Sequence, residues 1–167
     1  HQHFVDRIVL TRGWLSGAFQ VLLHSPDVAA RIANIGDFVL YHSVLPPAVQ
    51  TLACLIAARE LDCNYAWDAS VRRARLAGVD GALIEALEHG KPLTPLAGEH
   101  SVIFSFCRQL LRGNHHIAED TYQAAIKQLG IAATVQLAVT VGYIAMMSLV
   151  ANAFDVPPAG DDSKPAL

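Results

Sequence analysis

The chain has 167 residues, enough for one domain with a sizeable core, and we expect that domain to cover residues 1–156. Hydrophobic residues make up 53% of the chain and charged residues only 16%, which favours a homo-oligomer whose subunits cover part of each other's apolar surface. The net charge of -3, with no basic run beyond VRRAR at 71–75, argues against a nucleic-acid partner.

The three cysteines, Cys54, Cys63 and Cys107, follow neither a CxxC pattern nor the Cys/His spacing of zinc sites. We therefore expect no disulfide framework and no bound metal, and free thiols favour a reducing compartment. The opening segment HQHFVDRIV has no apolar signal core. We expect a chain that is not exported and that resides in the cytoplasm.

The first helix signals are prolines at positions where a helix can begin. Ser25 is a candidate cap and Pro26 suits the first helical position, which predicts a helix over about 26–42. Pro47 opens another helix over roughly 47–60 in the same way, and this second segment carries its apolar residues as one stripe at helical spacing.

Two further helices are bounded by residues that start and stop helices well. Asp62 is placed to cap a helix that runs to Ala77, and Gly78 can adopt the left-handed conformation that ends it. Asp80 can cap a short helix that ends near His89.

After this point one loop and several more helices are expected. Two prolines make KPLTPLAG at 91–98 a predicted loop, whereas apolar spacing indicates helices over about 102–113 and 118–129, the latter stopped by Gly130. No stretch alternates apolar and polar residues like a half-buried strand. We therefore predict an all-α fold, a single-domain helical bundle of about seven or eight helices.

No residue from Gln128 to Phe154 is charged, a length sufficient to span a bilayer. Polar residues such as Gln136 and Tyr143, and the absence of nearby Lys or Arg anchors, argue against a membrane helix. We expect instead a central helix buried on all sides inside an oligomer, with no membrane association. The polar, Pro-rich tail at 157–167 is expected to be disordered.

The segment from Thr51 to Gly78 combines reactive residue types with a sharp spacing. Cys63, Ala66 and Ser70 lie on one line along a helix face, because positions seven apart are separated by two turns. We expect a ligand to bind along this line.

The run LACLIAARELDCNYAWDASVRRARLAGVDGALIEAL at 52–87 resembles the carboxymuconolactone decarboxylase family, which includes the alkyl hydroperoxidase D type proteins. The resemblance extends to LLHSPDVAARIANIGDFVLYHSVLPP at 22–47 and VGYIAMMSLVANAFDVP at 141–157. It implies an all-α domain that assembles as a dimer, trimer or hexamer, with a pocket for a small-molecule substrate between helices near the subunit contacts.

The resemblance also implies which positions carry chemistry. The peroxidase branch of the family has a glutamate, a CxxC and a histidine, and the matching positions here are Thr51, Cys63, Ala66 and Ser70. Only Cys63 keeps its family residue, so the base and the second thiol that a dithiol peroxidase needs are both missing from these places. One of the other two cysteines, or an external thiol, remains an alternative partner for Cys63.

Two histidines are the candidate bases that this motif lacks. His24 and His42 flank the predicted helix over 26–42, and histidine can act as a base near neutral pH. Helix capping or packing is the alternative role for each of them. We take either His42 or His24 as the candidate general base.

The remaining candidates come from the motif itself. Tyr65 is the candidate hydrogen-bond donor to a ligand, and Trp67 is a candidate wall of the pocket. Packing in the core or in an interface is the alternative for both aromatic side chains. Cys63 near a helix start would take part in the site or, alternatively, pack as a small apolar side chain. The residues expected to contact substrate are Thr51, Ala66, Trp67 and Ser70.

Three functions remain open from the sequence. The leading hypothesis is a cofactor-free acid/base enzyme, a lyase, isomerase or hydrolase that acts on a small organic acid, lactone or related carbonyl compound. The second is a peroxidase or thiol reductase that uses Cys63. The third is a non-catalytic oligomer that binds a small molecule, because the usual acid/base positions are replaced.

Overall fold

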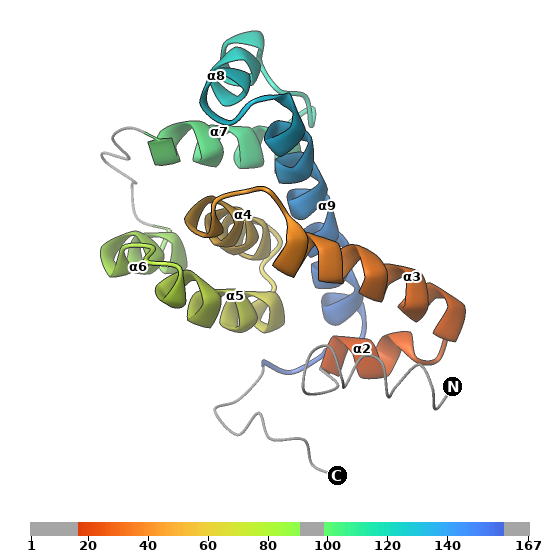
Figure 1. Cartoon of the computed structure of the whole chain (residues 1–167). Helices are drawn as coiled ribbons and strands as arrows, with labels where there is room; N and C mark the ends of the chain where they lie inside the picture. Colours follow the sequence, from red (N-terminus) through yellow and green to blue (C-terminus); the bar gives the residue numbers. More distant parts are fainter. Residues whose placement is uncertain (1–16, 91–98, 159–167) are drawn as a thin grey trace.

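The computed structural model describes residues 17–90 and 99–158, and over these ranges the chain is helical with no strand (Figure 1). The predicted all-α class is therefore confirmed. The predicted loop at 91–98 and most of the predicted tail at 157–167 lie outside the described residues, as do residues 1–16. The described elements are α2 (Gly17–Leu22), α3 (Pro26–Asp37), the π-helical turn η1 (Phe38–His42), α4 (Pro47–Glu60), α5 (Asn64–Leu76), α6 (Gly81–Glu88), α7 (Glu99–Leu111), α8 (Glu119–Leu129) and α9 (Ile131–Ala153).

Helix α4 lies at the centre of the fold and packs mainly against α5, α7 and α9 (Figure 1). Every residue from Val49 to Ala58 is buried, so this stretch has no side that faces solvent. The sequence predicts a single apolar stripe along this helix, whereas the structure buries all sides of it. A helix with apolar or small side chains on every side needs partners on every side, and the neighbouring helices supply them.

Local stop and start signals place several helix ends as predicted. Gly78 and Gly130 both have a left-handed φ of 79°, after α5 and α8 respectively. The Oδ1 of Asp80 accepts a hydrogen bond from the backbone N–H of Ala82 at 2.9 Å, which caps α6.

The predicted cap of α5 is wrong by one residue. Cys63, rather than Asp62, is the N-cap, and its Sγ accepts a hydrogen bond from the backbone N–H of Ala66 at 3.5 Å. Asp62 instead takes a left-handed conformation, with φ of 48°, in the short turn between α4 and α5. A tight turn after the last residue of α4 moves the start of the next helix along by one position.

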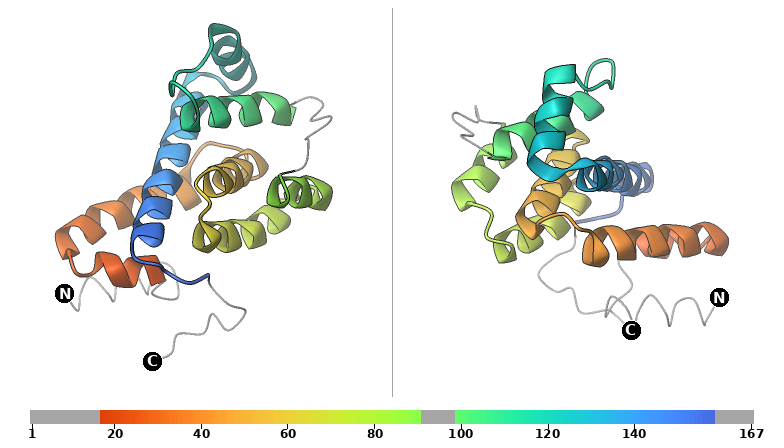
Figure 2. Two further views of the ribbon diagram at one scale, coloured as in Figure 1. Left: turned by 180° about the vertical axis from the view of Figure 1, so that it is seen from behind. Right: turned by 45° about the horizontal axis from the view of Figure 1, so that its top comes forward.

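The helix predicted over 26–42 changes its winding near its end. It is α-helical to Asp37 and then continues as the π-helical turn η1 to His42. Helices α2 and α3 together form an arm that projects from the body of the protein (Figure 2). The turn η1 follows α3 and packs against α9, and Gln50 of α4 donates a hydrogen bond to it. The turn borders the site described below.

Helix α9 is the longest described helix, and it contacts α2, η1, α4, α5, α7 and α8. It is long and apolar enough to cross a membrane, yet half of its most apolar 18-residue stretch is buried inside the fold. The expected burial on all sides was for a helix inside an oligomer, and in the single chain Ile131, Val135 and Leu149 are exposed. One side of α9 belongs to the core and the other faces outward.

Candidate functional site

A hollow of about 350 Å³ opens between the turn η1, the start of α4 and the end of α5. Three separate elements build it, and side-chain hydrogen bonds from α4 and α5 to η1 hold them together. The residues that line it are Leu40, Tyr41, Ser43, Leu45, Pro47, Gln50, Thr51, Arg73, Leu76 and Ala77.

Arg73 is the one charged side chain among the described residues that line the hollow. Its Nη2 donates a hydrogen bond to the backbone carbonyl of Leu40 at 2.8 Å and another to the Oε1 of Gln50 at 3.5 Å. Its guanidinium carbon lies 5.4 Å from the centre of the Tyr41 ring, within the range of a cation–π contact. Residues of η1 and α4 therefore fix the position of the Arg73 side chain, which belongs to α5.

Gln50 makes the second tie between α4 and the turn. Its Nε2 donates a hydrogen bond to the backbone carbonyl of Val39, and its side chain is buried. Carbonyl groups at the end of a helix have no partner inside that helix, so they need donors from elsewhere. Gln50 supplies one for Val39 and Arg73 supplies one for Leu40.

The hollow has an uncompensated positive charge. The Nε and Nη1 groups of Arg73 make no hydrogen bond or ion pair with any residue in ranges 17–90 and 99–158. No carboxylate is found among the described lining residues. Nε and Nη1 point to opposite sides of the guanidinium, so they do not grip one carboxylate together. Each can donate a separate hydrogen bond to an oxygen of an anion, and the charge itself favours a small organic anion in the hollow.

Thr51 is the one predicted site residue that lines the hollow within the described part of the chain. Its Oγ1 donates a hydrogen bond to the backbone carbonyl of Pro47 at 2.8 Å. The hydroxyl proton is therefore committed to α4, and the oxygen can still accept a hydrogen bond from a ligand.

The line formed by Cys63, Ala66 and Ser70 is buried and does not border the hollow. The Oγ of Ser70 donates a hydrogen bond to the carbonyl of Ala66 at 2.7 Å, and the Sγ of Cys63 accepts one from the N–H of Ala66. The predicted alignment on one face of the helix is present. Its polar atoms, however, are satisfied within α5, and the face is part of the packed core.

The two aromatic candidates also lie away from the hollow. Trp67 is buried in the core. Tyr65 packs near the start of α2, where a Cβ added to Gly17 would lie 3.9 Å from its Cε2 atom. The structure thus separates both aromatic side chains from Thr51.

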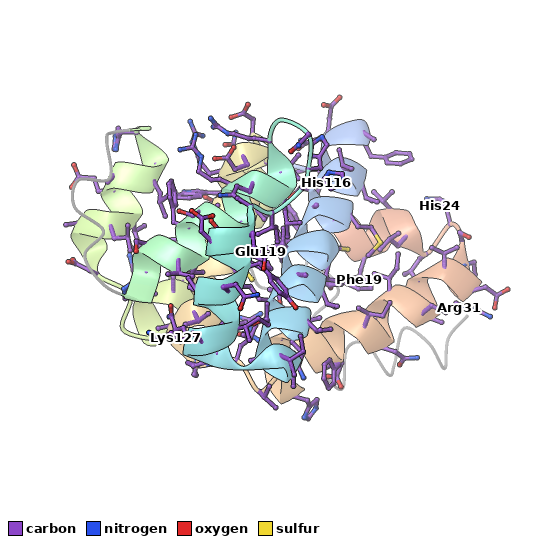
Figure 3. The ribbon with its side chains drawn as sticks, turned by 90° about the horizontal axis from the view of Figure 1, so that it is seen from above. Phe19, His24, Arg31, His116, Glu119 and Lys127 are labelled. Atoms are coloured by element: carbon purple, nitrogen blue, oxygen red, sulfur yellow. The ribbon has the colours of Figure 1, made fainter. Side chains whose placement is uncertain are left out.

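The two candidate histidines occupy different parts of the molecule. His24 is exposed in the turn between α2 and α3, at the outer end of the arm (Figure 3). His42 ends η1, and its Nε2 lies 3.4 Å from the Oδ2 of Asp37. Its chain neighbours Tyr41 and Ser43 both line the hollow, although His42 itself does not. Of the two, only His42 is next to the site along the chain.

The two other cysteines, Cys54 on α4 and Cys107 on α7, are buried thiols in the core. Burial raises the pKa of Cys54 to about 11, and the charge of Arg73 counteracts part of that effect. Burial, together with the neighbouring Cys54, raises the pKa of Cys107 well above its ordinary value. Both groups are therefore held as neutral thiols at physiological pH, which makes them poor nucleophiles.

The sequence reasoning missed the residues that define the hollow, above all Arg73 and Gln50. In the sequence, Arg73 stands out only as part of the short basic run at 71–75. Gln50 did carry a signal, because an amide within the apolar segment 47–58 requires a partner once that segment is buried. Nothing in the linear spacing linked it to an arginine 23 residues further on.

The fold and the site together define an all-helical protein with a cationic hollow between helices. No group of three or more His, Cys, Asp or Glu side chains in the described ranges is arranged to hold a metal ion. Comparisons with protein-family models, with curated proteins and with solved structures find no match to this chain.

Proposed function

We propose that this protein binds a small organic acid in the hollow, with the carboxylate on Arg73. The observation that carries the proposal is the pair of free guanidinium nitrogens, Nε and Nη1, in a lining without a described counter-charge. Gln50 and Tyr41 hold the guanidinium in place before the ligand arrives, so little side-chain freedom is lost on binding.

The size and lining of the hollow narrow the ligand class. A volume of about 350 Å³ is at the small end of ligand sites, which run from about 300 to 1,000 Å³. Leu40, Leu45 and Leu76 supply apolar wall next to the charge. The expected ligand therefore combines one carboxylate with a short apolar body.

Titration calorimetry with a panel of short carboxylic acids, each paired with its neutral amide, tests this proposal. We expect the acids to bind and the amides to bind at least about tenfold more weakly, because the amide lacks the charge. Arg73→Gln should remove the preference, and Arg75→Gln, an exposed arginine on the same helix, is the matched control. Equal binding of acids and amides by the unchanged protein would contradict the proposal.

A second candidate is the cofactor-free acid/base enzyme suggested by the resemblance to carboxymuconolactone decarboxylases. The observation in its favour is the pairing of His42 with Asp37, because a carboxylate beside an imidazole orients it and supports its role as a base. A compound that binds at Arg73 should then be converted, and His42→Gln should abolish conversion while leaving binding unchanged. A ligand that binds but is returned unaltered would establish a binding protein instead.

The thiol reaction has less support than either of these. Burial keeps Cys54 and Cys107 as neutral thiols, and Cys63 is 1% exposed with its Sγ engaged in capping α5. Free thiols in these places fit the reducing environment of the cytoplasm, where we propose that the protein acts. Peroxide treatment followed by mass spectrometry should leave Cys63 unmodified in the folded protein.

A further inference from the structure

Thr51 offers the hollow a hydrogen-bond acceptor that the proposed carboxylate site does not use. Its side chain lines the hollow next to Gln50 and is only 4% exposed. The Oγ1 proton is directed to the backbone carbonyls of Pro47, at 2.8 Å, and Ala48, at 3.3 Å. No donor from ranges 17–90 and 99–158 is bonded to this oxygen, so its lone pairs are open to a ligand.

The bond from Thr51 to its own helix is not in itself a sign of function. Thr134 on α9 is equally buried, and it donates its hydroxyl proton to the carbonyl four residues earlier in the same way. The two threonines differ in their surroundings, because Thr51 lines the hollow and Thr134 does not. Only Thr51 therefore shares a site with the guanidinium of Arg73.

The other polar side chains of the lining are occupied or reached by water. The Oγ of Ser43 donates a hydrogen bond to the Oε1 of Gln136 at 2.8 Å and accepts one from the backbone N–H of Leu45 at 3.2 Å. Gln50 binds a carbonyl of η1 through Nε2 and approaches Arg73 through Oε1. The side chain of Tyr41 is more than half exposed, so water can serve its hydroxyl.

A ligand that suits both Arg73 and Thr51 needs two different groups. Arg73 favours an anion, whereas the Oγ1 of Thr51 has no proton to give and favours a group that donates a hydrogen bond. A hydroxyl and an ammonium group can both donate. The ammonium group is disfavoured because Arg73 is positive and the described lining holds no carboxylate to offset the repulsion. A neutral hydroxyl meets both requirements.

We propose that the hollow selects a short hydroxy acid, which binds Arg73 through its carboxylate and donates a hydrogen bond from its hydroxyl to the Oγ1 of Thr51. This selection rests on the carboxylate site proposed above and makes Thr51 the residue that determines specificity. An acid without the hydroxyl displaces water from the buried Oγ1 and supplies no donor in return, so it binds more weakly.

Calorimetry with acids of equal chain length tests the selection. The set consists of butyrate, its 2-hydroxy and 3-hydroxy derivatives, and its 2-amino and 3-amino derivatives. We expect at least one hydroxy acid to bind the unchanged protein about threefold to tenfold more tightly than butyrate, the range that one hydrogen bond contributes. Both amino acids should bind more weakly than butyrate.

Substitutions at Thr51 separate the effect of the hydroxyl from that of the side-chain shape. Thr51→Val keeps the shape and loses the acceptor, so it should still bind butyrate but no longer prefer the hydroxy acid. Thr51→Ser keeps the oxygen and should keep the preference. Thr134→Val removes an equally buried hydroxyl away from the hollow, and as the matched control it should also keep the preference. Circular dichroism checks that each variant remains folded.

The results distinguish the role of Thr51 from that of Arg73. Equal binding of butyrate and both hydroxy acids by the unchanged protein, tighter binding of an amino acid than of butyrate, or a preference that survives Thr51→Val would overturn the selection while leaving the carboxylate site in place. If the unchanged protein bound none of these acids, both proposals would fall.

Discussion

Arg73 on α5 and Leu40 in the turn η1 are 33 residues apart in the sequence, and a 2.8 Å hydrogen bond joins the Nη2 of one to the backbone carbonyl of the other. The bond satisfies a carbonyl at the end of a π-helical turn and fixes the direction of the guanidinium. One interaction therefore shapes the hollow and positions its charge. Changes at Arg73 should affect both stability and ligand binding.

Replacing Arg73 by lysine should keep the charge but lose the planar fork of donors. We expect Arg73→Lys to lower the free energy of unfolding by about 1–2 kcal/mol, because a charged hydrogen bond to Leu40 and the contact with Tyr41 are weakened. Urea unfolding measures the change. Arg75→Lys, at an exposed position, should stay within about 0.5 kcal/mol of the unchanged protein, and equal stability of the two variants would contradict a structural role for Arg73.

Replacing Gln50 by glutamate should place a carboxylate next to Arg73, where the amide Oε1 now lies 3.5 Å from Nη2. This internal carboxylate would compete with the ligand, so we expect the affinity for small organic acids to fall by at least about tenfold. Calorimetry measures the affinity. The exposed change Gln123→Glu on α8 is the control, and unaltered binding by Gln50→Glu would show that acids bind elsewhere.

Glu60 forms an ion-pair cluster with two arginines, Arg108 and Arg112. Its side chain is only 9% exposed, and it lies 3.1 Å from the Nε of Arg108 and in contact with Arg112, which ties the end of α4 to α7. We expect Glu60→Gln to cost about 2–4 kcal/mol, because two guanidinium groups lose their counter-charge.

The exposed pair of Asp27 and Arg31, 3.9 Å apart, provides the comparison for this cluster. Asp27→Asn should cost less than about 0.5 kcal/mol, because water screens that pair. Denaturant unfolding of both variants measures the difference. If Glu60→Gln and Asp27→Asn lowered the free energy of unfolding equally, burial would not strengthen the ion pairs of Glu60.

The buried thiols predict a loss of stability in alkaline solution. Cys54 ionises near its ordinary value of 9.0 when unfolded and at about 11 when folded. Below pH 9 the thiol is neutral in both states and the contribution to stability is complete. Between pH 9 and 11 the unfolded chain loses the Cys54 proton while the folded chain keeps it, so the free energy of unfolding falls over that range. Cys54→Ala should flatten this part of the stability curve, as measured by urea unfolding at several pH values. A slope identical to that of the unchanged protein would contradict the prediction.

The helical class and most helix ends could be predicted from the sequence because their causes are local. Pro26, Pro47 and Asp80 start helices, and Gly78 and Gly130 stop them, through backbone geometry that depends on a few neighbouring residues. The cap of α5 shows the limit, because choosing between Asp62 and Cys63 required the path of the turn after α4.

Only the tertiary structure decided where the polar groups meet. Helical periodicity correctly placed Cys63 and Ser70 on one face, but the packing of α5 against α4 makes that face part of the core. Arg73 and Gln50 acquire their roles from carbonyl groups of η1, which come from a distant part of the chain. Periodicity tells which residues share a face, whereas the partner that covers the face depends on long-range contacts. For that reason the sequence determined an all-helical chain, and the fold alone assembled its cationic hollow.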